Sequence, residues 1–243
     1  HMSLTIMLIA GAAFLATLLG GALALRLRDK LHLVLGFSAG AVIAVAFFDL
    51  LPEAIELGEG LHDVGTILLF TALGFFGYTI LDRTITLHTH TAEDTHAHGA
   101  TRGRFGAGTL SSHSFLDGFA IGLAFQASEA VGLVVAAAVL AHDFSDGINT
   151  VNMILKNGGT RKEAMRWLLI DALAPVAGAL VTLFIAVPES LLAPVLATFA
   201  GFFLYIGASD LLPESHHAHP KFLTTAMTLV GATLLYVVIQ IAG

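Results

Sequence analysis

Eight long apolar runs dominate the sequence. Each is close to the roughly 20 residues that a helix needs to cross the hydrocarbon core of a bilayer. Backbone polar groups inside a bilayer must be satisfied within the segment, and no alternating pattern typical of membrane β-barrels is present, so the runs predict helices. The sequence therefore predicts an all-α integral membrane fold with eight transmembrane helices. The runs cover residues 4–25, 31–52, 64–87, 105–126, 130–155, 164–187, 190–212 and 221–242.

The composition excludes an ordinary soluble domain. Of the 243 residues, 56% are hydrophobic and only 12% are charged, and the mean hydropathy is +0.84. Eight spans with short connections use up this length, so we expect one transmembrane domain over residues 3–243. His1 and Met2 are expected to be a cloning remnant. The apolar stretch after Ser3 has neither a basic leader nor a cleavage site, so we expect it to be a retained first helix.

Charge and cysteine content narrow the possible partners. The formal net charge is -7, so there is no basic surface to meet phosphates, and nucleic acid is excluded as a partner. Cations and the lipid bilayer are the expected partners instead. The chain contains no cysteine, which excludes disulfides, iron–sulfur clusters and thiolate metal sites. A bound metal would have to be held by nitrogen and oxygen atoms.

All of the Lys and Arg residues fall on one side of the membrane when eight spans are drawn. The connections on the other side carry acidic residues and no Lys or Arg. By the positive-inside rule, the basic side faces the cytoplasm and both termini lie outside. The basic residues are Arg26, Arg28, Lys30, Arg83, Arg102, Arg104, Lys156, Arg161, Lys162, Arg166 and Lys221.

Two similar polar segments interrupt the fourth and fifth predicted spans. They read HSFLDG and HDFSDG, and in each the His and the Asp stand four residues apart. His113 with Asp117, and His142 with Asp146, therefore share one helix face. The two spans run in opposite directions, which places His113 level with Asp146 and Asp117 level with His142. Four nitrogen and oxygen ligands can then surround one or two cations.

Further acids, Asp143 and Asp171, offer carboxylates for a second, oxygen-rich position. Burying such groups in a membrane costs several kcal/mol, and a cation is the compensating partner. Imidazole with carboxylate suits transition metals such as Zn²⁺, Mn²⁺ or Fe²⁺ better than Ca²⁺ or Mg²⁺. The alternative without a metal is a set of hydrogen-bonded pairs with Asp143 and Asp171 protonated. Two such segments on consecutive spans make this the weaker interpretation.

A second repeated segment, DLLPE, is expected to end the second and seventh spans, on opposite sides of the membrane. The copies begin at Asp49 and Asp210 and finish at Glu53 and Glu214. This placement predicts an inverted repeat of spans 1–3 and 6–8 around spans 4 and 5, as in alternating-access carriers. We expect the four acids to line the entrance and exit of a cation pathway. The alternative is that the proline in each copy simply ends its helix and the acids are solvated.

The one long connection, residues 88–104, follows the third span on the cytoplasmic side. It holds His88, His90, His96 and His98 among Thr, Ala and acidic residues, so we expect a flexible loop. Paired histidines of this kind bind divalent metal ions, although a solubilising linker is equally compatible with the composition.

Taken together, these motifs resemble the Zrt/Irt-like (ZIP) divalent metal transporters along nearly the whole chain. The resemblance rests on the two His–Asp segments, Asp171, the two DLLPE copies and the histidine-bearing loop. It implies a 3+2+3 arrangement of eight helices, frequently dimeric, that imports Zn²⁺ or related ions through a binuclear centre between helices 4 and 5. The resemblance assigns His113, Asp117, His142 and Asp146 to a primary site, and Ser114, Asp143 and Asp171 to a secondary site.

The segments depart from the HNxPEG pattern usual in that family. Ser114 stands in place of Asn, Leu116 and Ser145 in place of two prolines, and both glutamates are aspartates. Without the two prolines, the family's helix kinks do not carry over to this chain. An Asp is one methylene shorter than a Glu and Ser114 is a poorer ligand than Asn, so the family's metal selectivity does not carry over either.

The sequence thus predicts a non-enzymatic carrier without a prosthetic group. It would move Zn²⁺, Mn²⁺, Fe²⁺ or Cd²⁺ into the cytoplasm by alternating access, in a bacterial inner membrane, with a homodimer as one permitted assembly. One alternative is an intramembrane zinc-dependent hydrolase that uses the same ligands to activate a bound water. Another is a proton-coupled carrier of organic solutes, with the His–Asp pairs as a proton relay. The inverted repeat and the surplus of ligands weigh against the hydrolase.

Overall fold

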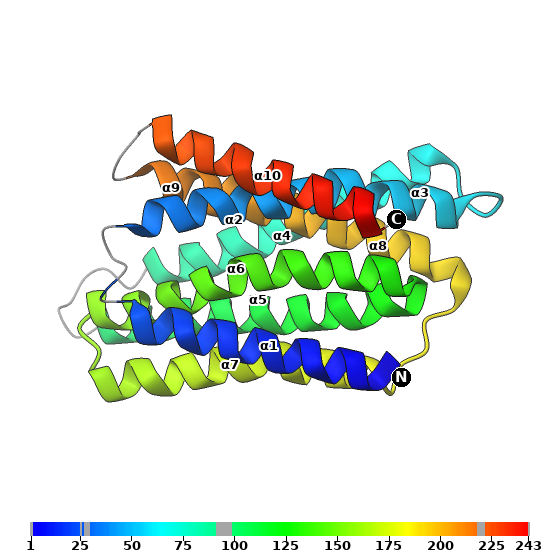
Figure 1. Ribbon diagram of the computed structural model, residues 1–243. Coiled ribbons are helices and arrows are strands. Elements are labelled where there is room, and N and C mark those ends of the chain that lie inside the picture. Colours follow the sequence, from blue (N-terminus) through cyan, green and yellow to red (C-terminus); the bar gives the residue numbers. More distant parts are fainter. Residues whose placement is uncertain (1, 25, 27–29, 91–98, 218–221, 243) are drawn as a thin grey trace.

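The computed structural model describes residues 2–24, 26, 30–90, 99–217 and 222–242. In this part of the chain all regular elements are helical, as predicted, and the long helices run side by side (Figure 1). The start of α1 and the end of α10 lie at the same end of the bundle (Figure 1). The elements are α1 (Met2–Leu23), α2 (Leu31–Val45), η2 (Ala46–Leu50), α3 (Leu51–Gly58), α4 (Val64–His90), α5 (Gly99–Ala127), α6 (Glu129–Lys156), α7 (Arg161–Thr182), α8 (Glu189–Tyr205), η3 (Ile206–Leu211), α9 (Leu212–His217) and α10 (Phe222–Ala242).

Eight helical segments correspond to the eight predicted spans. Within the described residues, seven of them are both long enough and apolar enough to cross a membrane. The eighth, α5, has ample length at 29 residues but is less apolar. Its middle part carries His113, Asp117 and the serines 111, 112 and 114. The span with the weakest apolar character is therefore one of the two that bear the predicted site.

The two DLLPE copies do not end helices, so that part of the prediction is wrong. Each copy starts inside a π turn, η2 or η3, and a further helix, α3 or α9, follows without a break. In these turns Leu51 N–H donates to Ala46 O and Leu212 N–H donates to Gly207 O, five residues back. Pro52 is the second residue of α3 and follows the π turn directly. A proline inside a continuous helix removes one backbone hydrogen bond, and here it falls where the helix already departs from regular α geometry.

The π turns also place two acids in equivalent positions. Asp49 is the second-last residue of η2, and Asp210 is the second-last residue of η3. Isolated π turns are rare and occur frequently at functional sites. Their presence in both copies supports the predicted inverted repeat of spans 1–3 and 6–8. These spans are α1, α2 to α3 and α4 in the first half, and α7, α8 to α9 and α10 in the second.

Four close helix crossings give the bundle its internal symmetry. At each one, two glycines face the neighbouring backbone so closely that a methyl group on either would overlap a main-chain carbonyl oxygen. The crossing of α1 with α6 corresponds to that of α7 with α5, and the crossing of α2 with α10 corresponds to that of α8 with α4. The pairs are Gly20 with Gly147, Gly178 with Gly118, Gly40 with Gly231, and Gly201 with Gly74.

These crossings tie the helices into two groups. The site group consists of α1, α5, α6 and α7, which pack on one another in the lower part of Figure 1. The second group contains α2, α3, α4, α8, α9 and α10 with the two π turns, and α2 packs on α10 while α4 packs on α8. The main contact between the groups is made by α2 against α6.

The connections between helices are short. The loop expected at residues 88–104 is shorter than predicted, because α4 continues to His90 and α5 begins at Gly99.

At the start of α4, Asp63 accepts a hydrogen bond from the Thr66 N–H at 3.0 Å and another from the Thr66 hydroxyl. These hydrogen bonds lower the pKa of the Asp63 carboxyl below its ordinary value. The neighbouring His62 ring contacts the carbonyl oxygen of Ser190 at 2.9 Å and so links this turn to α8.

Candidate metal centre

Four donor atoms from α5 and α6 converge in the interior of the bundle. His113, Asp117, His142 and Asp146 are all buried, and their ligand atoms lie within 4.8 Å of one another. Asp117 Oδ2 lies 3.1 Å from His113 Nε2 and 3.0 Å from His142 Nε2. Asp146 Oδ2 lies 3.8 Å from each of the same two nitrogens. The structure brings together the four residues that the spacing of the two segments singled out.

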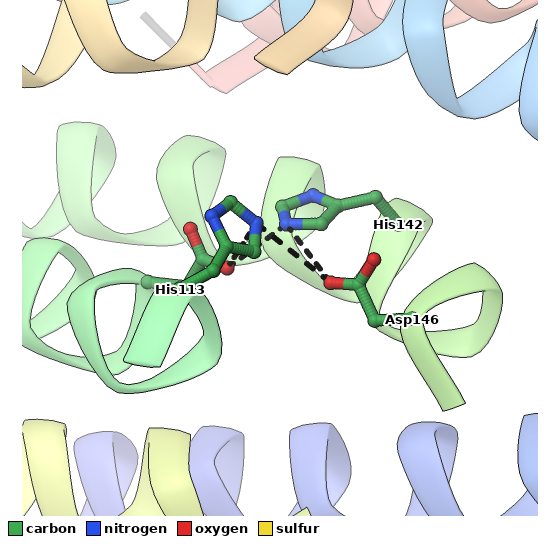
Figure 2. Close-up of side chains that lie close together, drawn as sticks. His113, His142 and Asp146 are labelled. Atoms are coloured by element: carbon green, nitrogen blue, oxygen red, sulfur yellow. Dashed lines mark hydrogen bonds and ion pairs between the residues drawn. The ribbon is translucent and has the colours of Figure 1, made fainter. Parts of the chain in front are cut away.

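The sequence predicted two pairs at different heights along the helices, His113 with Asp146 and Asp117 with His142. The structure instead brings all four donors to one place, with Asp117 against both histidines. Figure 2 shows His113 reaching from one helix toward His142 and Asp146 on the other, with the ring nitrogens and a carboxylate oxygen pointing at a common centre. A zinc ion with nitrogen and oxygen ligands at about 2.0–2.2 Å needs tetrahedral donors about 3.3–3.6 Å apart. The distances of 3.0–3.8 Å between nitrogens and oxygens bracket that value. All four donor atoms lie within 4.8 Å of one another, so a single ion would draw the more distant ones closer together.

No Lys or Arg lies near the carboxylates along α5 and α6, whose basic residues stand only at the ends remote from the cluster. Residues 105–155, which include both site-bearing spans, contain no Lys or Arg. Asp117 is 2% exposed and Asp146 is 4% exposed, so water does not offset the charge either. Buried carboxylates in a membrane require a counter-charge or protons. A divalent cation between the four donors would supply that counter-charge.

Each imidazole uses its second nitrogen to contact a different part of the protein. Nδ1 of His142 faces the carbonyl oxygen of Ala138 on its own helix at 2.9 Å. Nδ1 of His113 faces the hydroxyl of Tyr78, on α4, at 3.0 Å. In both rings the Nε2 atom is thereby directed at the cluster. Outer partners of this kind orient metal-binding histidines and fix their tautomers.

A second polar cluster joins the three helices α5, α6 and α7. Asp171 Oδ1 accepts a hydrogen bond from the Ser114 hydroxyl at 2.8 Å, and Oδ2 accepts one from the Thr150 hydroxyl at 2.9 Å. Asp171, Ser114 and Thr150 are fully buried. The pairing of Ser114 with Asp171 was expected from their assignment to one site, whereas Thr150 was not identified from the sequence. Its only sequence signal is its place one turn after Asp146.

Asp143 has a different environment from Asp171. Its side chain is fully buried, and neither carboxylate oxygen has a hydrogen-bond partner among the described residues. Buried polar atoms without partners are rare and usually mark a functional position or an absent ligand. Asp143 follows the cluster residue His142 directly in the sequence, which makes it the strongest candidate for a further ligand.

Helix α6 is held beside the cluster by a contact from the second group. The Ser38 hydroxyl, on α2, donates to the Ala141 carbonyl oxygen at 2.7 Å and lies 3.1 Å from the Ser145 hydroxyl. Ala141 and Ser145 directly precede the cluster residues His142 and Asp146 in the sequence. Ser38 could not be identified from the sequence, because no local pattern marks a lone serine in an apolar helix as a contact.

The predicted pathway residues belong to other helical segments than the four-donor cluster. Asp49 and Glu53 are half-buried in η2 and α3, and Asp49 Oδ2 has no hydrogen-bond partner among the described residues. Asp210 and Glu214 lie in η3 and α9, and their side chains are outside the described part of the structure. The same holds for the side chains of His88 and His90 at the end of α4, and His96 and His98 fall in the undescribed stretch 91–98.

Comparison with known proteins connects this arrangement to one family. The zinc transporter ZupT of Corynebacterium aurimucosum is 28% identical over 246 aligned positions, which cover 90% of this chain and 92% of the relative. The zinc transporter zipt-7.2 of Caenorhabditis elegans is 32% identical over 135 positions, 52% of this chain and 29% of the relative. The zinc transporter ZIP4 of Homo sapiens is 36% identical over 101 positions, 42% of this chain and 16% of the relative.

The family profile described as ZIP zinc transporter matches residues 107–239, which is more than half of the chain. The matched stretch begins within α5 and ends within α10. It therefore contains all four donors of the cluster together with Asp143 and Asp171. The chain belongs to the ZIP family of zinc transporters.

Proposed function

We propose that this protein carries divalent transition-metal cations across a membrane, through the cluster of His113, Asp117, His142 and Asp146. The observation that carries the proposal is the convergence of two imidazole nitrogens and two carboxylate oxygens within 4.8 Å, in the interior of a bundle of apolar helices. Zn²⁺ suits this donor set, and Mn²⁺, Fe²⁺ and Cd²⁺ are the other candidate substrates. The names of the relatives, all zinc transporters, support the same reading.

A second cation position beside the first is part of the proposal. Asp143 is the candidate ligand there, because it is buried and its carboxylate has no hydrogen-bond partner among the described residues. Each oxygen of the Asp171 carboxylate already accepts one hydroxyl hydrogen bond, which occupies part of its capacity to bind a metal. We therefore rank Asp143 above Asp171 and Ser114 as a ligand of the second ion.

We further propose that transport runs into the cytoplasm of a bacterium, in its plasma membrane, with both chain termini outside. The support is the distribution of Lys and Arg, which places the basic connections on the cytoplasmic side. Asp49 and Glu53 would then attract the cation on the outer side, and Asp210, Glu214 and the histidines 88, 90, 96 and 98 would receive it on the inner side. Residues 3–243 would act as one transport unit, alone or as a homodimer.

Alternating access requires one part of the bundle to move relative to another around the site. The grouping of helices supports a movement of the site group against the second group, because the glycine crossings lock helices within each group. The metal would travel with α5 and α6, which carry all four donors.

Uptake into proteoliposomes tests the proposal. Zn²⁺, Mn²⁺, Fe²⁺ and Cd²⁺ are offered separately to vesicles containing the wild type, Asp117→Ala or His142→Ala. We expect uptake of at least one metal by the wild type and loss of that uptake in both variants. Equal uptake by wild type and variants would refute the site.

The zinc hydrolase is not favoured, since the named relatives are transporters. A carrier of organic solutes would show no metal binding at all.

A further inference from the structure

The hydroxyl of Tyr78 is a polar contact that reaches the cluster from outside the site group. Tyr78 lies on α4, in the second group, and its oxygen is 3.0 Å from Nδ1 of His113 on α5. Both side chains are buried, at 8% and 7% exposed. The two rings meet edge to face, with centroids 6.1 Å apart. Tyr78 therefore contacts a proposed metal ligand from the opposite side of the boundary between the helix groups.

The chemistry of the contact favours metal binding through the other ring nitrogen. A histidine that binds a metal through Nε2 carries its hydrogen on Nδ1 and needs an acceptor there. The Tyr78 oxygen, at 3.0 Å, is placed to be that acceptor. The contact thus holds the His113 ring in the orientation that directs Nε2 at the cluster, and the hydroxyl can accept the hydrogen that metal binding leaves on Nδ1.

Tyr78 is itself held firmly by its neighbours on α8. Its ring packs on Tyr205 with centroids 5.2 Å apart and on Phe202 with centroids 5.6 Å apart. The Tyr205 hydroxyl donates to Asp82 Oδ2, one turn after Tyr78 on α4, at 2.8 Å. The two ring contacts, which Tyr205→Phe would keep, lie within the second group and hold Tyr78 to that group.

The two cluster histidines therefore differ in what orients them. The partner of His142 Nδ1 is the carbonyl oxygen of Ala138, on the same helix, so it stays in place wherever α6 moves. The partner of His113 Nδ1 belongs to the other group and is lost if α5 moves past α4. Of the two cluster histidines, His113 is the one that is oriented from the other helix group.

We infer that Tyr78 is a positioning residue that orients His113 for metal binding from across the boundary between the helix groups. This inference rests on the proposed function of the cluster. It makes the affinity for metal depend on the relative position of the two groups, since the site loses one orienting contact when they separate. Mutation of comparable outer partners of metal ligands typically lowers metal affinity about 10–100-fold.

The test compares two substitutions that each remove one tyrosine hydroxyl and keep the ring. Tyr78→Phe loses the contact with His113, while the control Tyr205→Phe loses the hydrogen bond to Asp82 on the same pair of helices. Zn²⁺ affinity of the purified, detergent-solubilised full chain is measured by competition with a chromophoric chelator. The visible absorption of the Co²⁺-loaded protein reports on the ligand environment, which a purely structural role would leave unchanged.

We expect Tyr78→Phe to bind Zn²⁺ about 10–100-fold more weakly and to alter the Co²⁺ spectrum. We expect Tyr205→Phe to bind within about threefold of wild type with an unchanged spectrum, well below the effect of losing an outer partner. Wild-type affinity in Tyr78→Phe, or equal losses in both variants with unchanged spectra, would overturn the inference. His142→Ala separates this from the proposed function: unchanged binding in that variant refutes the site itself, whereas lost binding there leaves the site standing whatever Tyr78→Phe does.

Discussion

Nε2 of His142 lies 3.0 Å from Oδ2 of Asp117 on the neighbouring antiparallel helix. The other ring nitrogen, Nδ1, faces a carbonyl oxygen, which can only accept a hydrogen bond, so the hydrogen of a neutral ring belongs on Nδ1. Nε2 then presents a lone pair to an oxygen of a carboxylate. Two acceptors at this distance repel each other unless a proton or a metal ion lies between them. Protons and metal are therefore alternative occupants of the cluster.

Zinc binding is accordingly expected to release protons, because the imidazoles must present lone pairs and the carboxylates must be ionised to bind the metal. Apparent affinity should fall as the pH is lowered through the acid range, since protons then compete for the same donors. Titration calorimetry in buffers with different ionisation enthalpies measures the number of protons released. The same heat in every buffer would contradict this account.

Asp117 is expected to be the most sensitive carboxylate of the cluster, because its Oδ2 lies within 3.1 Å of both histidine nitrogens. Asp117→Asn keeps the size of the side chain but removes the charge. We expect a loss of Zn²⁺ uptake larger than the roughly 10–100-fold range typical of outer-shell changes. Ser112→Ala is the matched control on the same helix, since that hydroxyl is exposed and, within the described part of the chain, its one hydrogen bond goes to the Gly108 carbonyl oxygen of its own helix. Similar losses in both variants would point to a general defect of α5.

Asp143 and Asp171 are expected to differ in what they contribute to stability. Asp143→Asn replaces one buried polar group without hydrogen-bond partners among the described residues by another of the same size, so the thermal stability of the metal-free protein should change little while uptake falls. Asp171→Ala breaks two hydrogen bonds between helices, which should cost about 0.6–2 kcal/mol each in the free energy of unfolding. Thermal unfolding in detergent measures both effects. A lower melting temperature for Asp143→Asn would show that its carboxylate has a structural partner.

The glycine crossings predict a difference between two otherwise similar substitutions. In Gly147→Ala the new methyl group would overlap the Thr17 carbonyl oxygen on α1, and relieving this clash should cost about 1–3 kcal/mol. Gly77→Ala, on α4, meets no atom within 4 Å and should be neutral or slightly stabilising. The melting temperatures of the two variants check this. Equal values would mean that α1 and α6 are not in close contact.

The sequence was a good guide to features that repeat along one helix. The spacing of four residues between His113 and Asp117, and between His142 and Asp146, was sufficient to predict that these side chains share a region of the bundle. The apolar runs were sufficient to predict eight helical segments. Both are local properties, set by the helix period and by the length of chain that a bilayer requires.

Features that depend on the packing of distant helices could not be predicted. Tyr78 and Ser38 lie in apolar segments with no pattern around them, and only the crossing of helices brings them to His113 and Ser145. The continuation of the helices beyond Pro52 was also missed, because proline usually marks a helix end and the π turn before it leaves no sequence signature.

The central claim is that one divalent ion binds between α5 and α6 through two histidines and two aspartates. Anomalous difference density at the zinc absorption edge, from crystals of the zinc-loaded protein, tests it most directly. We predict a peak at about 2.0–2.2 Å from the Nε2 atoms of His113 and His142 and from an oxygen of Asp117 and of Asp146. Zinc density found only elsewhere, for example at the histidines between α4 and α5, would contradict the claim.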